Sequence, residues 1–214
     1  MKPSEIPGRF VALEGPDGGG KTTQAVRLAS WLGSLGREVV ACRDPGGTAL
    51  GERLRTLVKE RSEVRIGMRA EMLLYMASRA QLVEDVIRPA LARGAFVVSD
   101  RFVLSNVAYQ GYAGGLDVAE VWDVARAATG GLMPDLTVIV DVDPSVARGR
   151  IGPSRDRIED RGLDYQSRVR DGFLRAVAAY PAAIAVVDGS GDPDSVARDI
   201  QGEVLRALAI DPRP

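Results

Sequence analysis

The sequence predicts an α/β fold built around a parallel β-sheet. Short apolar runs rich in β-branched residues recur along the chain, and longer stretches with helical periodicity separate them. Strands of a parallel sheet are buried on both faces, which gives continuous apolar runs instead of an alternating pattern. Ligands of such folds bind at the carboxyl edge of the sheet. The predicted strands are Phe10–Glu14, Glu38–Cys42, Ala95–Ser99, Leu136–Val142 and Ile184–Val187.

The stretches between these runs predict the helices. The first helix should stop at Gly36, because glycine is favoured just past a helix end. The third is long, and Pro89 should kink it or begin its last turns, because proline cannot donate a helical hydrogen bond. The predicted helices are Lys21–Leu35, Leu50–Lys59, Met68–Arg93, Asp117–Ala128, Pro144–Arg150, Asp164–Ala179 and Asp194–Leu208.

Length and composition bound the class of protein. A chain of 214 residues with 45% hydrophobic and 27% charged residues predicts a single globular domain over 1–214. The net charge of −1 disfavours general binding to nucleic acid or to acidic membranes, so we expect small-molecule partners. Cys42, the single cysteine, excludes an intrachain disulfide, and nothing before Phe10 resembles a signal peptide or a membrane anchor. We therefore expect a cytoplasmic protein.

The chain contains no histidine. Nucleophilic catalysis by Ser-His or Cys-His pairs and histidine-based metal sites are thereby excluded. A bound metal should be hard and oxygen-ligated, and Mg²⁺ on a nucleotide meets that requirement.

The segment Gly15–Thr22 reads GPDGGGKT and fits the phosphate-binding pattern G-x-x-x-x-G-K-[ST]. Glycines let backbone N–H groups curl around an anion, and the following helix adds the positive end of its dipole. Lys21 can then reach the β- and γ-phosphates, and the Thr22 hydroxyl can ligate Mg²⁺. The alternative is a glycine-rich turn with an incidental lysine. The predicted strand before the segment and helix after it favour a P-loop.

Further polar clusters follow the next two strands. Arg43–Thr48 follows the second strand and could be a simple turn, but its position beside a P-loop favours a binding role. After the third strand, Asp100 suits a group that holds Mg²⁺ directly or through water, and Arg101 suits an anionic substrate. A structural ion pair between them is the alternative.

Two other groups are weaker signals. Tyr75 and Arg79 lie four residues apart on one face of the long helix, where they could recognise a planar base. Without context, this spacing favours core packing for Tyr75 and solvent exposure for Arg79. The cation-rich segment Arg148–Arg161 could be a solvated loop, or a closing lid whose arginines neutralise a transferred phosphoryl group. We predict a mobile lid at about 148–161.

These motifs, in this order and spacing, make the chain resemble the bacterial thymidylate kinases, from Phe10 to the last helix. The segments that carry the resemblance are Gly15–Thr23, Arg43–Thr48, Tyr75–Gln81, Asp100–Gly111, Pro134–Asp141 and Asp156–Glu159. The resemblance implies a P-loop nucleoside monophosphate kinase fold with sheet order 2-3-1-4-5 and helices on both faces. It also implies transfer of the γ-phosphoryl group of ATP to dTMP, giving dTDP, with Mg²⁺ and in a homodimer.

The resemblance also implies roles for individual residues. ATP would be bound by Gly15, Pro16, Asp17, Gly18, Gly19, Gly20, Lys21, Thr22 and Thr23, and the metal by Thr22 and Asp100. dTMP would be bound by Asp17, Arg55, Tyr75, Arg79, Arg101, Asn106, Tyr109 and Gln110.

Within the implied dTMP site, Asp17 matches the acid at the 3′-hydroxyl, and Arg101 and Arg55 match the arginines at the acceptor phosphate. Tyr75 matches the aromatic ring that stacks on thymine, and Arg79 the arginine bonded to the base carbonyl. Two amides, those of Asn106 and Gln110, resemble the groups that line base and sugar. The remaining residue, Tyr109, resembles the one that crowds out a 2′-hydroxyl.

The sequence departs from the family at two positions that bear on the site. Asp44 replaces the commoner glutamate of the R-E-P-G-G-T motif, so a contact made there could be shorter or lost. Gly18 stands where eukaryotic members carry a P-loop arginine, so the catalytic cation must come from the lid, and the candidates are Arg150 and Arg155. Lys21, Arg101 and these lid arginines are the predicted catalytic residues.

The predicted reaction needs no general base, because a phosphomonoester with a second pKa of about 6 is already anionic near neutral pH. Catalysis would then consist of alignment and charge neutralisation. Two alternatives remain: a kinase for another deoxynucleotide or a deoxynucleoside, and a nucleotide-dependent switch protein. A nucleoside acceptor would need a base near the γ-phosphate, for which Asp100 or Asp17 could serve.

Overall fold

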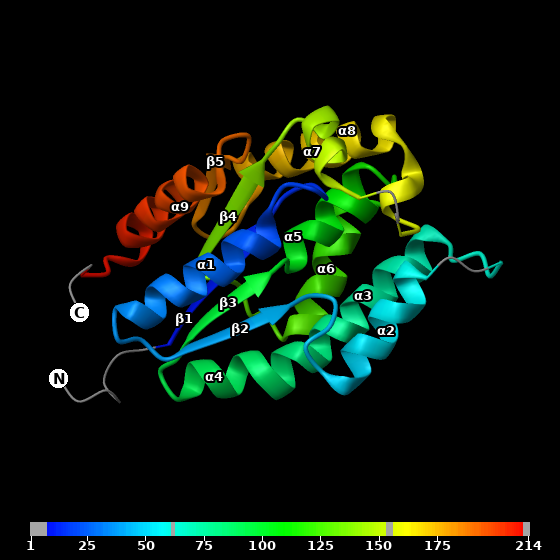
Figure 1. The fold of residues 1–214 in the computed structure, drawn as a ribbon. Helices are drawn as coiled ribbons and strands as arrows, with labels where there is room; N and C mark the ends of the chain where they lie inside the picture. The colour runs from blue at the N-terminus through cyan, green and yellow to red at the C-terminus, as the bar shows by residue number, and fades with distance from the viewer. Residues whose placement is uncertain (1–7, 61–62, 153–155, 212–214) are drawn as a thin grey trace.

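The computed structural model describes residues 8–60, 63–152 and 156–211. Its centre is a parallel five-stranded sheet with the order β2-β3-β1-β4-β5, which confirms the predicted order (Figure 1). Neighbouring strands pair residue by residue without interruption; for example, Ala12 of β1 lies opposite Ser99 of β3 on one side and Thr137 of β4 on the other. The strands are β1 (Arg9–Glu14), β2 (Val39–Arg43), β3 (Phe96–Asp100), β4 (Leu136–Asp141) and β5 (Ile184–Asp188).

Burial differs between the central and the edge strands. β1, β3 and β4 are buried along nearly their whole length, as their apolar runs predict. The prediction of full burial is wrong for β2 and β5, which keep exposed or half-buried residues. Both lie at an edge of the sheet, where a strand has a neighbour on one side only.

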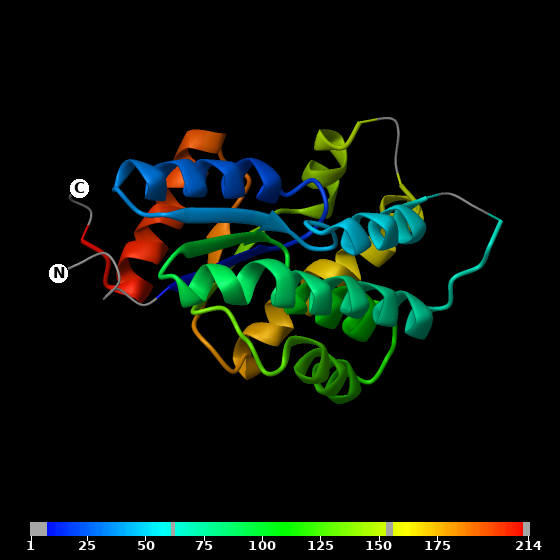
Figure 2. The ribbon, with the colours of Figure 1, turned by 90° about the horizontal axis from the view of Figure 1, so that it is seen from below.

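Helices cover both faces of the sheet (Figure 2). On one face, Leu28 and Leu32 of α1 pack in a buried cluster with Ile200 and Val204 of α9. The other face carries the larger cluster, built around α3, α5, α6 and α8. The helices are α1 (Lys21–Ser34), α2 (Ala49–Lys59), α3 (Met68–Leu82), α4 (Arg88–Ala92), α5 (Val103–Asn106), α6 (Val118–Thr129), α7 (Pro144–Arg150), α8 (Leu163–Ala176) and α9 (Pro193–Leu208).

The long helix predicted over Met68–Arg93 is divided by a π-helical turn, Val83–Ile87, between α3 and α4. Pro89 lies in the first turn of α4. A proline in the first turn of a helix lacks only an N–H that would have no partner within that helix, so Pro89 is tolerated there. The preceding π-helical turn, with its i→i+5 hydrogen bonds, connects α3 to α4.

A second π-helical segment, Val107–Tyr112, follows α5 directly, and the sequence analysis did not predict either of them. The wider turn spacing of a π-helix shifts side chains from α-helical positions, and such segments are frequent at functional sites. Tyr109 and Gln110 are both buried within this segment.

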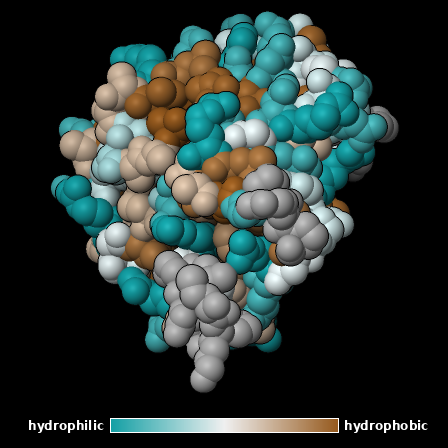
Figure 3. All heavy atoms as spheres, turned by 90° about the vertical axis from the view of Figure 1, so that its left-hand side faces the viewer, coloured by the Kyte–Doolittle hydropathy of each residue, from teal (hydrophilic) through white to brown (hydrophobic). Residues whose placement is uncertain are grey.

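The carboxyl ends of all five strands lie at the same edge of the sheet. At the opposite end, where the strands begin, Figure 3 shows apolar patches interrupted by hydrophilic residues. None of the helices in the described ranges is long and apolar enough to cross a membrane.

Candidate active site

The P-loop connects β1 to α1 at the carboxyl edge. Gly15 and Gly18 have positive φ angles of 134° and 77°. A β-carbon on Gly15 would lie 2.4 Å from the carbonyl oxygen of Val140, and one on Gly18 would lie 2.2 Å from that of Ala147. Any other residue would therefore displace the loop from β4 and α7. No side chain caps the N-terminus of α1, so its first N–H groups are available to an anion.

Lys21 begins α1 and is only 5% exposed. Its Nζ donates to the carbonyl oxygen of Pro16 at 2.6 Å. Burial, followed by the positive charge of Arg101, lowers the pKa of Lys21 to about 8. A bound phosphate would favour the charged form, because an opposite charge raises the pKa of an amine.

Thr22 and Asp100 offer two hard oxygen ligands next to Lys21. The Thr22 hydroxyl donates to Oδ2 of Asp100 at 2.5 Å. Among the described residues no group of three or more carboxylate, cysteine or histidine side chains could hold a metal ion. This pair suits Mg²⁺, which keeps several waters and is usually bound by one or two protein oxygens together with substrate phosphates.

Arg101 lies in the left-handed region with φ 72°, an uncommon conformation for a residue other than glycine. Its backbone N–H donates to the carbonyl of Leu13 at 2.9 Å. Its guanidinium donates to the carbonyl of Gly15 at 2.9 Å and to Oδ1 of Asp17 at 2.5 Å. These bonds hold the cation against the P-loop.

Asp17 and Tyr109 complete this part of the site. The Tyr109 hydroxyl donates to Oδ2 of Asp17 at 2.8 Å, and the guanidinium of Arg101 lies 5.2 Å from the centre of the tyrosine ring. Burial alone would raise the pKa of Asp17, but the charges of Arg101 and Lys21 lower it to about 2. The carboxylate is therefore ionised at any physiological pH.

Glu14, at the end of β1, is fully buried and holds the turn that carries Arg101. It accepts hydrogen bonds from the backbone N–H of Phe102 at 2.8 Å and from the hydroxyl of Ser105 at 2.6 Å. Ser105 in turn accepts a bond from the Arg101 guanidinium at 2.9 Å. Burial raises the pKa of Glu14 to about 6. The sequence analysis counted this residue only as part of a strand.

Arg79 is 1% exposed, so the solvent exposure expected from its helical spacing is wrong. Its guanidinium donates to Oδ2 of Asp44 at 2.5 Å, to Oδ1 of Asn106 at 2.6 Å and to the carbonyl of Phe102 at 2.9 Å. A buried guanidinium needs acceptors, and these lie on three elements that the spacing within one helix cannot reveal. Asp44 makes this contact although it is shorter than the usual glutamate.

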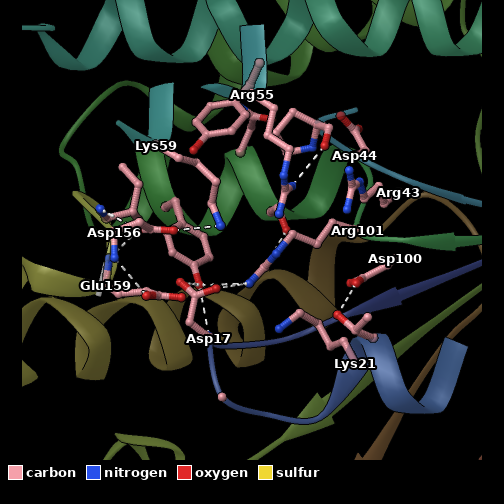
Figure 4. A pocket seen from close by; sticks show the side chains of 18 of the residues that line it. Asp17, Lys21, Arg43, Asp44, Arg55, Lys59, Asp100, Arg101, Asp156 and Glu159 are labelled. Atoms are coloured by element: carbon pink, nitrogen blue, oxygen red, sulfur yellow. Dashed lines mark hydrogen bonds and ion pairs between the residues drawn. The ribbon is translucent and has the colours of Figure 1, made fainter. Parts of the chain in front are cut away.

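One cavity of about 330 Å³ brings the two halves of the site together. Its lining includes all eight residues predicted for dTMP and Asp17, Gly18, Gly20, Lys21, Thr22, Thr23 and Asp100 of the predicted ATP and metal sites. In Figure 4, Asp17 and Arg101 point toward one another, with Lys21 and Asp100 on the α1 side and Arg55 and Lys59 across the cavity. The Arg55 guanidinium donates to the Pro45 carbonyl at 3.0 Å.

Some predicted residues lie elsewhere. Gly15, Pro16 and Gly19 shape the P-loop without lining this cavity. Arg150, at the end of α7, donates to the carbonyls of Gly189 and Ser190 at 2.8 and 3.0 Å and does not line it. Arg155 lies outside the described residues.

The cavity is also lined by residues that the predicted set omitted, among them Lys59, Asp156, Ile158 and Glu159. Lys59 ends α2, and its Nζ lies 2.6 Å from Oδ2 of Asp156. The sequence prediction for segment 148–161 rested on its arginines and assigned no role to the acids beside them. The available signal was the Asp156–Glu159 motif itself.

The P-loop and a pocket lined by arginines share one cavity at the carboxyl edge of a parallel sheet. This arrangement defines a P-loop phosphotransferase that acts on two anionic substrates. Comparison with known proteins narrows this class. The thymidylate kinase family matches residues 13–200, and the chain belongs to that family.

Individual relatives agree with this assignment. A thymidylate kinase from Clavibacter sepedonicus is 47% identical over 205 residues, covering 94% of this chain and 97% of the relative. One from Leifsonia xyli subsp. xyli is 46% identical over 93% of this chain and 95% of its own length. One from Solidesulfovibrio magneticus is 42% identical over 93% of this chain and all of its own length.

Proposed function

We propose that this protein transfers the γ-phosphoryl group of ATP to dTMP, giving dTDP. The observation that carries the proposal is the shared cavity, in which Lys21 of the P-loop and the neighbouring Arg101 are two separate cations, each able to bind a phosphate group. Membership of the thymidylate kinase family supplies the identity of the acceptor. A phosphate monoester held at Arg101 would present an already anionic oxygen to the γ-phosphate, so no general base is required.

The donor half would act through the P-loop amides, Lys21 and the Thr22–Asp100 pair. The amides and Lys21 would neutralise the β- and γ-phosphates and hold them in line with the acceptor. Thr22 and Asp100 would hold Mg²⁺, which when bound neutralises the charge of the transferred group. Both offer oxygen, the ligand type that this ion prefers.

The acceptor half would use Arg101 and Arg55 for the phosphate and Tyr75, Arg79, Asn106 and Gln110 for the base. Tyr109 would exclude a 2′-hydroxyl. Support comes from the hydrogen bond of Tyr109 to Asp17, which holds the tyrosine against the P-loop within the lining of the cavity. We also propose that the segment 148–161 acts as a lid that excludes water from the reacting groups. That one of the two arginines, Arg150 or Arg155, contacts ATP stays a prediction.

The homodimer is also a proposal. It rests on the family resemblance, and Leu50 and Leu57 on α2 and Leu73 on α3, which are 45%, 48% and 49% exposed, are apolar side chains that an interface over these two adjacent helices would cover. Sedimentation velocity of the purified chain tests this, and a monomer at micromolar concentration would argue against it. The cytoplasmic location likewise stays a prediction from composition.

A coupled assay of ADP release over a panel of nucleoside monophosphates, with thymidine added as a nucleoside acceptor, tests the main proposal. We expect dTMP to be the preferred acceptor and thymidine to be inactive. A preference for thymidine would favour a deoxynucleoside kinase, and a preference for another monophosphate would move the acceptor assignment. ATP turnover unaffected by any monophosphate would favour a switch protein.

A further inference from the structure

Glu71 on α3 is a fully buried carboxylate that does not line the cavity. It nevertheless contacts Gln110, which lines the cavity, and two arginines of the segment 156–161, which contributes other lining residues. Its Oε1 accepts a hydrogen bond from Nε2 of Gln110 at 2.9 Å. Its Oε2 accepts a bond from Nη2 of Arg157 at 2.7 Å and another from Nη2 of Arg161. We propose that Glu71 is a positioning residue for the acceptor site, because it joins the base-contacting wall of the cavity to the 156–161 wall.

On the Gln110 side, a chain of hydrogen bonds runs from Arg79 to Glu71. Arg79 donates to Oδ1 of Asn106, Nδ2 of Asn106 donates to Oε1 of Gln110 at 2.9 Å, and Gln110 donates to Glu71. All three bonds point in the same direction. A guanidinium can only donate and an ionised carboxylate can only accept, so the two charged ends fix the orientation of both amides between them.

On the other side, Glu71 holds the segment that closes the cavity opposite α1. Arg157 donates to the carbonyl of Val58 as well as to Glu71, and Arg161 donates to the hydroxyl of Tyr165 at 2.8 Å. These arginines flank Ile158 and Glu159, which line the cavity. Loss of the Glu71 charge would leave two half-buried guanidinium groups without their shared acceptor, and the wall between them would lose its anchor.

The consequence is specific to the acceptor. Among the described residues no hydrogen bond or ion pair joins Glu71, Arg157 or Arg161 directly to the P-loop, and the nearest route to it runs through Tyr165 and Tyr109, so removal of the charge should weaken dTMP binding much more than ATP binding. This inference rests on the proposed function, since it assumes that Asn106 and Gln110 contact the acceptor.

The test is Glu71→Gln, with steady-state kinetics for both substrates of the full chain. Glutamine keeps the size of the side chain but can donate to Gln110 and carries no charge for the arginines. We expect the KM for dTMP to rise on the order of tenfold, within the range of coupling between sites in one network, and the KM for ATP to change less than about twofold. Glu71→Asp retains the charge and should recover part of the dTMP affinity.

Glu120→Gln is the matched control, because Glu120 also pairs with an arginine of α3, Arg69, but on the exposed surface. It should leave both KM values unchanged. If Glu71→Gln does not fold, Arg161→Gln replaces it, because Arg157 still pairs with Glu71 in that variant. The same selective rise for dTMP, at smaller magnitude, is then expected.

Equal rises in both KM values, or a lowered melting temperature with unchanged KM for dTMP, would overturn the positioning role. So would a Glu71→Asp variant no better than Glu71→Gln. The wild-type chain separates this from the main proposal. If it does not phosphorylate dTMP, the proposed function itself has failed, whereas normal wild-type turnover with an unaffected variant removes only the role of Glu71.

Discussion

The donor and acceptor halves of the cavity are built by different means. In the donor half, one continuous segment supplies all the groups but one: the P-loop backbone, Lys21 and Thr22 lie within Gly15–Thr22, and only Asp100 comes from elsewhere, at the end of β3. In the acceptor half, side chains come from α2, α3, α5, the π-helical segment Val107–Tyr112 and the turn after β3. Backbone amides bind any phosphate, whereas converging side chains can distinguish one nucleotide from another. The first half should therefore determine whether a triphosphate binds, and the second which acceptor is used.

The two halves also differ in how their charges are balanced. Arg101 and Arg79 are each paired with a carboxylate, that of Asp17 and Asp44 respectively. Lys21 is bonded to a backbone carbonyl and has a lowered pKa, so its charge is the least stabilised of the three before a ligand binds. A bound anion should therefore stabilise the charge of Lys21 in the donor half more than the charges of the two arginines, which already have carboxylate partners. The predictions below separate the halves on this basis.

The largest effect is expected from Lys21→Ala. Loss of the cation that meets the β- and γ-phosphates should lower kcat by a factor on the order of 10³, because the charge that develops in the transition state loses a fixed counter-charge. Calorimetric titration should still detect dTMP binding at close to wild-type affinity. Arg27→Ala is the control on the same helix, since Arg27 pairs with Asp194 at the surface. Turnover above a tenth of the wild-type rate would contradict the role of Lys21.

Arg101→Ala should affect the opposite half. The variant loses the cation proposed for the acceptor phosphate, and it leaves the half-buried Asp17 without its ion-pair partner. We expect the KM for dTMP to rise by roughly a hundredfold, equivalent to about 2.7 kcal/mol, with a much smaller change for ATP. Arg206→Ala on the exposed face of α9 serves as the control. Unchanged dTMP kinetics would remove Arg101 from the acceptor site.

A change of pH should separate the halves without any substitution. The pKa of Lys21 is lowered from 10.5 to about 8 in the free protein, so its charge is present below pH 8 and is lost as the pH rises above it. Because kcat/KM reports the free enzyme, that ratio for ATP should fall at about pH 8 and be roughly tenfold lower at pH 9.

The ratio kcat/KM for dTMP, measured at saturating ATP, should stay level between pH 7 and 9. Arginine remains charged over this range, and a phosphomonoester with a second pKa of about 6 is already about nine-tenths in its dianionic form at pH 7. Parallel declines for both substrates would mean that the group titrating near pH 8 does not belong to the donor half alone.

The same division explains what the sequence could predict. Strand positions and the P-loop follow from apolar runs and from one contiguous motif, whereas the order of the strands came from the resemblance to a family; the structure agrees with all of them. The roles in the acceptor half came from a resemblance to a family, because no local pattern joins Arg79 to Asp44 and Asn106. The helical spacing of Tyr75 and Arg79 even pointed Arg79 toward solvent, and the buried acceptors that hold it are 27 and 35 residues away.

Other features could not be read from local sequence for a similar reason. The π-helical segment Val107–Tyr112 has no signature that distinguishes it from a loop or an α-helix, yet it sets the positions of Tyr109 and Gln110. Glu14 and Glu71 read as an ordinary strand end and an ordinary helix residue. Their full burial and their partners 88 to 91 and 39 to 90 residues away reveal them as supports of the site.

The smallest of the predicted effects concerns the selectivity of the acceptor half. Tyr109→Phe keeps the ring, which packs against Phe173 and Tyr165, but removes the hydroxyl bonded to Asp17. The space and the altered Asp17 should make a ribose more acceptable, so the preference for dTMP over UMP, as a ratio of kcat/KM values, should fall about fivefold. Including dUMP separates the effect of the 2′-hydroxyl from that of the base methyl group. Tyr180→Phe, which loses only a hydrogen bond to Thr137 away from the cavity, should leave the ratio unchanged. An unaltered ratio in Tyr109→Phe would mean that sugar selectivity comes from other residues of the acceptor half.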